Sequence, residues 1–409
     1  MSEKVKFFGL SAEKGRWIFV VLGLIINICL GSVYSWSVFR KPLENIFSIG
    51  ATESGLPFMI FLAFFALLMP VAGRFLEKYG VRKVCIFGGL IVGVGWILAG
   101  FSSNIIFLTI SYGVIAGTGV GIVYGGPIAT SARWFPDRKG LAVGLTIAGF
   151  GLSPFITAPL ARALIDLYGP LTTFQVLGAL FLVLLIAVSA PLKNPPVGWS
   201  PSGWTPPKTS SRTIDVNTSQ MLRTSTYFGL WACYIIGTLT GLMAIGISSP
   251  VGQEIIKLDP GTAALAVSIF AVLNGVGRPL FGWLTDRLTP RNSSIISFII
   301  IFLVSIGMLN AGEGEIALYL LCFAGFWLTL GGWLAIAPTA TATFFGTTNY
   351  AKNYGVMFTA YGIGAIIGNL ISGRLRDVFG SYSASFYPTA GLAVVGILMS
   401  VTLLKPPKR

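Results

Sequence analysis

The chain of 409 residues is 54% hydrophobic, and only 10% of its residues are charged. Water-soluble domains carry about 25% charged residues, so this composition excludes an ordinary soluble domain. The sequence has no histidine, the commonest general base and metal ligand, and we expect neither a metal nor a cofactor. The net charge of +14 comes from basic residues at the ends of apolar runs rather than from a continuous stripe, which argues against nucleic-acid binding. Four cysteines lie singly in apolar runs and are interpreted as small buried hydrophobes: Cys29, Cys85, Cys233 and Cys322.

Twelve apolar runs are long enough to cross a bilayer, whose core takes about 20 helical residues. The expected spans in chain order are 17–40, 53–73, 82–101, 104–131, 141–165, 172–192, 226–249, 262–282, 292–310, 316–342, 354–372 and 385–404. This pattern predicts an all-α membrane protein. A polar segment rich in Pro, Ser and Thr follows the sixth span and reads as a linker. We therefore expect three parts: an N-terminal six-helix bundle over 1–192, a linker over 193–224 and a C-terminal six-helix bundle over 225–409.

The distribution of lysine and arginine predicts the orientation in the membrane. If the N-terminus is cytoplasmic, the cytoplasmic segments hold 21 of these residues and the loops on the other side hold 6. Cytoplasmic loops are the ones enriched in Lys and Arg, so both termini are expected in the cytoplasm. We expect a multi-pass protein of the cell membrane, with lipid as its surroundings, and a monomer.

The two halves of the chain repeat. An offset of 211 residues lays residues 126–130 (GPIAT) on residues 337–341 (APTAT). A repeat of six spans plus six is the architecture in which one bundle rocks against the other around a central site. An offset of 209 lays the loop after the second span on the loop after the eighth, pairing Gly73, Glu77 and Lys78 with Gly282, Asp286 and Arg287.

Residues 73–83 (GRFLEKYGVRK) resemble the loop motif G-x-x-x-D-R-x-G-R-[KR] of the major facilitator superfamily. Glu77 and Lys78 stand where that motif has Asp and Arg, and the second copy has Thr289-Pro290 where a glycine would stand. The resemblance implies a fold of two six-helix bundles and secondary active transport. It also implies a gating role for Gly73, Glu77, Gly282, Asp286 and Arg287.

Other classes of membrane protein fit the sequence less well. An intramembrane enzyme needs convergent polar side chains inside the spans, but all 14 Asp and Glu lie at span ends, in loops or in the tail. We therefore expect no enzymatic activity. A seven-span receptor has the wrong number of spans and no internal repeat. An anion channel and a membrane protein that transports nothing remain alternatives, although no short filter loop is visible.

Arg278 is the most informative residue, because it lies within the eighth span. A charge in the membrane costs a few kcal/mol, and arginine does not escape by losing its proton. A structural ion pair has no obvious partner, and extension of the side chain toward the cytoplasmic face is a second structural interpretation. The functional interpretation is that the substrate is the missing counter-ion. A guanidinium fits a carboxylate through two parallel hydrogen bonds, so the expected cargo is an organic acid anion.

Several neutral residues are candidates for the same site. Asn274 lies one helical turn before Arg278, where it can bind substrate or bond to a neighbouring helix. Three tyrosines fall in spans one, four and eleven, and a buried tyrosine hydroxyl usually needs a partner. Core packing is the alternative for each of these tyrosines, which are Tyr34, Tyr124 and Tyr361.

A narrower resemblance comes from residues 133–149 (RWFPDRKGLAVGLTIAG), which look like the signature of the monocarboxylate transporters and still more like the oxalate:formate antiporter family. The resemblance places the families' span-eight arginine on Arg278, the monocarboxylate transporters' proton-linked aspartate on Asn274 and their span-one lysine on Tyr34. The lysine of the oxalate carrier falls on Tyr361. One buried charge balances one carboxylate, so lactate is the leading expected cargo, followed by pyruvate.

Leu145 and Phe358 are candidate apolar walls for a short acyl chain. Uptake is expected to be proton-coupled symport, and Asp377, beside Arg374 and Arg376, is the candidate proton site. An oxalate/formate-type anion exchanger is the alternative within the transporter class.

Overall fold

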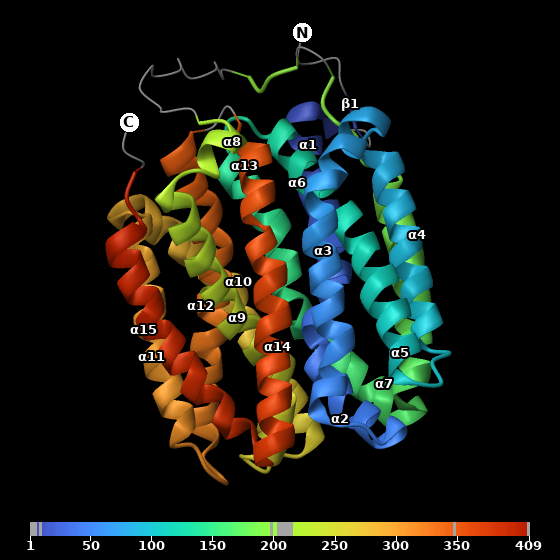
Figure 1. Ribbon diagram of the computed structural model, residues 1–409. Coiled ribbons are helices and arrows are strands. Elements are labelled where there is room, and N and C mark those ends of the chain that lie inside the picture. The colour runs from blue at the N-terminus through green and yellow to red at the C-terminus, as the bar shows by residue number, and fades with distance from the viewer. Residues whose placement is uncertain (1–5, 8–9, 197–198, 203–215, 347–348, 407–409) are drawn as a thin grey trace.

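The computed structural model describes residues 6–7, 10–196, 199–202, 216–346 and 349–406. Long helices run side by side through the molecule, with the first half of the chain on one side and the second half on the other (Figure 1). The start of α1 and the end of α15 lie at the same end of the bundle (Figure 1). We call this end the terminal face and the other end the opposite face.

The first half begins with a pair of two-residue antiparallel strands and continues as helices. Its elements are β1 (Lys6–Phe7), β2 (Leu10–Ser11), α1 (Ala12–Gly31), η2 (Ser32–Ser35), α2 (Trp36–Phe47), α3 (Ala51–Tyr79), α4 (Val81–Ala99), α5 (Ile105–Leu108), η3 (Thr109–Ala116), α6 (Gly117–Trp134) and α7 (Lys139–Ser189).

The described elements of the second half are all helices. Its elements are α8 (Thr218–Met221), α9 (Ser225–Glu254), α10 (Pro260–Leu288), α11 (Pro290–Leu309), α12 (Ile316–Phe345), α13 (Tyr350–Met357), α14 (Thr359–Phe379), η4 (Tyr382–Ser385) and α15 (Phe386–Leu403). The short helix α8 lies within the segment expected as a linker.

Within the described residues, 11 helical segments are long and apolar enough to cross a membrane. One of them, Gly140–Ser189, holds two of the expected spans. It breaks at Gly169, whose φ of 77° and ψ of 166° leave the helical region, and Pro170 starts the next helix. The all-α fold of about a dozen membrane-spanning helices is therefore confirmed, and the three domain boundaries stay a prediction.

The first membrane segment differs from its expected extent, because helix continues through η2 and α2 to Phe47. Arg40, the last residue of the expected first span, lies within this longer helical segment and is fully buried. It donates to the hydroxyl of Ser54 at 3.0 Å and to the carbonyl of Gly246 at 3.2 Å. Arg278 is accordingly not the only cation inside the bundle, but Arg40 has protein partners that satisfy it.

The internal repeat is visible in the backbone of the two related loops. Gly80, between α3 and α4, has φ 80° and ψ 156°. Thr289, at the matching position between α10 and α11, has φ 111° and ψ 154°. Both loops make the same turn, which suits glycine and strains a residue with a side chain. The turn is therefore a property of the repeat rather than of the residue that occupies it.

Candidate functional site

Arg278 is buried in the middle of α10 without a carboxylate partner. Its Nη1 donates to the carbonyl of Ile147 on α7 at 2.7 Å, and its Nη2 donates to Oδ1 of Asn274 at 3.4 Å. The Nε atom is buried and has no hydrogen-bond partner. None of the ion pairs found among the described residues involves Arg278. The side chain turns back toward Asn274, so extension toward the terminal face is not its conformation here.

Asn274 holds the guanidinium in place from one turn away. Its side-chain amide donates to the carbonyl of Trp327 on α12 at 3.0 Å, while its oxygen accepts from Arg278. The side chain is fully buried. Both ends of this amide are therefore engaged by protein groups, which matches the interhelical alternative and gives Asn274 the geometry of a positioning residue.

Gly151 allows α7 to approach these two side chains. A Cβ atom at this position would lie 2.6 Å from Oδ1 of Asn274 and 3.3 Å from Nη2 of Arg278. Real Cβ contacts are rarely this short, so any larger residue has to displace the guanidinium or its support. The guanidinium therefore lies directly against the backbone of the first half of the chain.

A cavity of about 490 Å³ opens beside Arg278 between α7, α10 and α12. It is lined by residues within 140–148, 275–282 and 334–339, and Leu145 is among them. Arg278 is the only charged lining residue among those described. A concave, mostly apolar pocket with few polar groups is typical of small-molecule sites. The cavity thus places one positive charge against an apolar wall.

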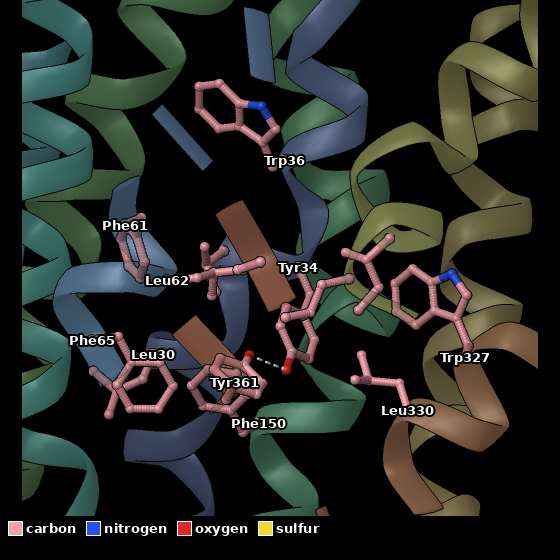
Figure 2. Packing of buried hydrophobic residues seen from close by; sticks show 14 of the residues in the cluster. Leu30, Tyr34, Trp36, Phe61, Leu62, Phe65, Phe150, Trp327, Leu330 and Tyr361 are labelled. Atoms are coloured by element: carbon pink, nitrogen blue, oxygen red, sulfur yellow. Dashed lines mark hydrogen bonds between the residues drawn. The ribbon is translucent and has the colours of Figure 1, made fainter. Parts of the chain in front are cut away.

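Tyr34 and Tyr361 join the two halves of the chain. Their hydroxyl oxygens lie 2.6 Å apart, and both side chains are almost fully buried. Figure 2 shows the two hydroxyl groups pointing toward one another, with the rings of Phe65 and Phe150 close by. The hydroxyl groups therefore satisfy each other.

An aromatic layer surrounds this pair, and we define it by six residues whose neighbouring ring centroids lie between 5.0 and 5.8 Å apart. Phe358 stacks on Tyr361 at 5.0 Å. Along α7, Phe150 of the layer lies between Ile147, whose carbonyl accepts from Arg278, and Gly151, whose backbone meets the guanidinium. The layer is therefore at the level of the guanidinium, and it consists of Tyr34, Phe65, Tyr124, Phe150, Phe358 and Tyr361.

Sequence reasoning missed Phe65, which contacts four other members of the layer from α3. A phenylalanine in a long apolar run carries no signal of its own, and only the fold shows where its ring lies. Leu145 lies in the cavity lining and Phe358 in the layer. The structure thus gathers Arg278, Asn274, Tyr34, Tyr124, Tyr361, Leu145 and Phe358 around one region.

At the opposite face, charged residues join the two halves. Lys41 on α2 pairs with Glu44 at 3.0 Å and with Glu254 on α9, and Arg376 on α14 binds the same Glu254 at 3.1 Å. Asp377 accepts hydrogen bonds from the backbone amides of residues 51 and 52, at 2.8 and 2.9 Å. These amides belong to the first turn of α3, which favours a negative charge. Asp377 therefore lies in a cross-half contact, away from the cavity lining.

At the terminal face, the described ion pairs stay within the first half. Arg16 binds Asp137 through two hydrogen bonds of 2.6 and 2.9 Å, and its guanidinium lies over the ring of Phe135. This contact with Arg16 holds the pKa of the Asp137 carboxyl below its ordinary value. The expected gating residues do not join the halves through ion pairs in the described structure: Gly73, Glu77, Gly282, Asp286 and Arg287.

The sequence model of the Major Facilitator Superfamily matches residues 18–326 and 230–409. The chain belongs to this superfamily. The expected family and fold are thereby confirmed, and the members are membrane transporters.

Similar proteins include an oxalate:formate antiporter and a monocarboxylate transporter. The oxalate:formate antiporter of Oxalobacter formigenes is 28% identical over 391 residues, which cover 95% of this chain and 91% of that protein. The uncharacterized MFS-type transporter YhjX of Escherichia coli (strain K12) is 28% identical over 87% of each chain. Monocarboxylate transporter 12 of Xenopus laevis is 23% identical over 90% of this chain and 84% of its own.

A solved structure shows the same fold. It is a bacterial homologue of the human lysosomal transporter Spinster, with a TM-score of 0.74 at 15% identity, and the match covers 97% of this chain and 98% of that one. At this identity the likeness concerns the fold alone. The roles of the individual site residues stay predictions.

Proposed function

We propose that this protein transports short-chain monocarboxylates across the cell membrane by alternating access, with lactate as the leading substrate and pyruvate next. The observation that carries the proposal is the buried Arg278, which has only neutral hydrogen-bond partners among the described residues and borders a cavity of about 490 Å³. A carboxylate in that cavity would pair with the guanidinium through two charge-assisted hydrogen bonds. The bound anion would act as the counter-ion of Arg278, which has no carboxylate partner among the described residues.

The size and charge of the cavity favour a single carboxylate. Its lining holds one positive charge, and the remaining side chains are almost all apolar. A second carboxylate would lose its hydration without meeting a cation, which costs several kcal/mol. Tyr361, where the resemblance places a lysine of the oxalate carrier, offers only a hydroxyl that already bonds to Tyr34. An oxalate/formate exchanger is therefore the second candidate, favoured by the similarity to the antiporter.

Alternating access would use the contacts between the halves. Arg278 belongs to the second half and bonds to Ile147 of the first, so a movement of one half changes the surroundings of the charge. At the opposite face the halves are joined by the Lys41–Glu254 pair and by Asp377 on α14, which accepts hydrogen bonds from the start of α3. These contacts would have to separate for substrate to enter from that side. We assign the terminal face to the cytoplasm on the basis of the lysine and arginine distribution.

Proton coupling is part of the proposal. The described cavity lining contains no carboxylate, so a proton that moves with the anion would bind elsewhere. Asp377 remains the candidate, since it lies in a contact that links the halves. A carrier without cofactor or enzymatic step is sufficient for this scheme, because the substrate and the proton gradient supply the charge and the driving force.

The test is uptake of radiolabelled lactate into proteoliposomes with an imposed pH gradient. We expect an inward proton gradient to accelerate uptake. Unlabelled lactate and pyruvate should inhibit the uptake of labelled lactate far better than oxalate does. Substitution Tyr361→Lys should raise the ratio of oxalate to lactate competition by adding a second cation. A wild-type preference for oxalate would overturn the monocarboxylate proposal and favour the exchanger. Flux without saturation or competition would favour an anion channel.

A further inference from the structure

The cavity beside Arg278 contains one further polar side chain, Thr339 on α12. Every other described lining residue is glycine, alanine, proline or an aliphatic residue. Thr339 is half-buried, so its side chain borders the cavity without being sealed from it. A single hydroxyl group facing an apolar cavity is the kind of polar group that fixes the orientation of a small ligand.

The hydroxyl of Thr339 differs from those of its helical neighbours. Threonines in helices commonly bond to the carbonyl four residues earlier. Thr341 does so toward Ala337 at 2.7 Å, and Thr343 does so toward the carbonyl of Thr339 itself at 2.8 Å. Among the hydrogen bonds of the described residues, none involves the hydroxyl of Thr339. This group is therefore free to bond to a ligand.

The internal repeat shows that the fold does not require a hydroxyl here. The 211-residue offset pairs Thr339 with Ile128 on α6, a partly buried residue that packs against the core. The neighbouring pair, Thr130 and Thr341, keeps threonine in both halves, and both hydroxyls bond to their own helix. Thr341 thus follows the repeat, whereas Thr339 departs from it at the position that borders the cavity.

Arg278 and Thr339 border the same cavity from two neighbouring helices, and Thr339 lies closer to the terminal face. Thr339 is about 9 Å from the terminal end of α12 and Arg278 about 15 Å from the terminal end of α10, at a rise of 1.5 Å per residue, so the two residues differ in depth by about 6 Å. The oxygen on C2 of a 2-hydroxy or 2-oxo acid is adjacent to the carboxylate. A small anion whose carboxylate binds the guanidinium can extend this oxygen toward Thr339 in the same cavity.

We propose that the hydroxyl of Thr339 forms a hydrogen bond with the oxygen substituent on C2 of the substrate. This bond makes the site selective for 2-hydroxy and 2-oxo monocarboxylates over unsubstituted acids. The inference rests on the proposed function, because it takes the carboxylate to be bound by Arg278. A threonine hydroxyl both donates and accepts, so it suits the hydroxyl of lactate and the keto oxygen of pyruvate. Propionate has the same carbon count and leaves this hydroxyl without a partner.

The test compares lactate with propionate in full-length protein, wild type and Thr339→Val, by competition with radiolabelled lactate in proteoliposomes. Valine keeps the shape of threonine and removes its hydroxyl. Thr339→Val should weaken competition by lactate about two- to tenfold, as expected for one neutral hydrogen bond, and leave propionate unchanged. Thr339→Ser should retain the wild-type ratio. Thr343→Val is the matched control, because its hydroxyl lies one turn away and bonds only within α12.

The possible outcomes distinguish a failure of the proposed role of Thr339 from a failure of the proposed transport function. An unchanged lactate-to-propionate ratio in Thr339→Val, or an equal loss for both acids, overturns the role of Thr339. A wild type that favours propionate overturns it too, while short-chain monocarboxylate transport still stands. A wild-type protein that takes up neither acid overturns the proposed function itself. If Thr339→Val fails to fold, Thr339→Ala, which also lacks the hydroxyl, and the wild-type preference decide the question.

Discussion

The hydroxyl oxygens of Tyr34 and Tyr361 lie 2.6 Å apart, and this hydrogen bond joins the two halves of the chain. Both groups are buried, and each is the other's partner. Removing one hydroxyl leaves the second buried and unpaired, a loss of about 1–3 kcal/mol, whereas removing both leaves no unpaired group. The pair therefore behaves as a unit.

We predict that Tyr34→Phe and Tyr361→Phe each lower the melting temperature, and that the double variant is no less stable than either single variant. The measurement is thermal unfolding of the three variants in the same detergent. The cycle isolates the contact because the rings keep their packing with Phe150 and Phe358. Additive losses in the double variant would show that the two hydroxyls do not depend on one another.

A second prediction concerns Gly151 on α7, whose backbone lies against the guanidinium of Arg278. Gly151→Ala should weaken lactate binding about tenfold or more, because its Cβ would lie 2.6 Å from Oδ1 of Asn274 and displace the support of Arg278. Isothermal titration with lactate measures the change. Gly391→Ala, where nothing lies within 4 Å of the added carbon, is the control. Wild-type affinity in Gly151→Ala would mean that Arg278 binds in a different conformation.

Thr289 gives a prediction about stability. With φ at 111° it occupies a glycine-like turn, a strain of about 1–3 kcal/mol. Its hydroxyl accepts one weak bond from the amide of Asn292 at 3.4 Å. Thr289→Gly should therefore raise the melting temperature slightly, by about 1–2 °C for a net gain near 1 kcal/mol in a chain of this size. Thr289→Ala keeps the strain and loses the bond, so it should lower the melting temperature, and a stabilised alanine variant would contradict this reading.

The contact between Arg16 and Asp137 predicts a pH dependence at the terminal face. Because the pKa of Asp137 in the folded protein lies below its ordinary value of about 3.9, the pair's contribution is complete above about pH 4. It fades as the pH falls through the folded-state pKa. Asp137→Asn should therefore lower the melting temperature at neutral pH, with the gap to wild type closing in acid. A gap that stays constant from pH 7 down to pH 3 would exclude this ion pair as its cause.

The sequence was sufficient for the fold, and it singles out Arg278, the residue at the centre of the candidate site. Long apolar runs indicate membrane spans because the bilayer leaves few other arrangements for them. Arg278 stands out because a charge in such a run is costly. Even the break at Gly169-Pro170 follows from two residues that end and start helices. The repeat between the halves was likewise readable from matched residues such as Gly73 and Gly282.

Other features depend on contacts between distant segments. Phe65 and Thr339 are ordinary residues for their helices and gain meaning only from what lies beside them. The burial of Arg40 depends on Gly246, which is 206 residues away. The π-helical turn at Thr109–Ala116 has no sequence signal that we recognise. Hydropathy identifies a span, but it does not show which face of the span meets the cavity.

The most direct test of the central claim is lactate binding to purified Arg278→Ala, with Arg278→Lys beside it. Because Arg278 has no carboxylate partner among the described residues, its removal should leave the protein folded, with a melting temperature at or above that of wild type. Titration calorimetry should then show binding in wild type, no binding in the alanine variant and weakened binding in the lysine variant, which keeps the charge but loses the paired donors. Wild-type lactate affinity in a folded Arg278→Ala protein would contradict the claim that the substrate is the missing counter-ion.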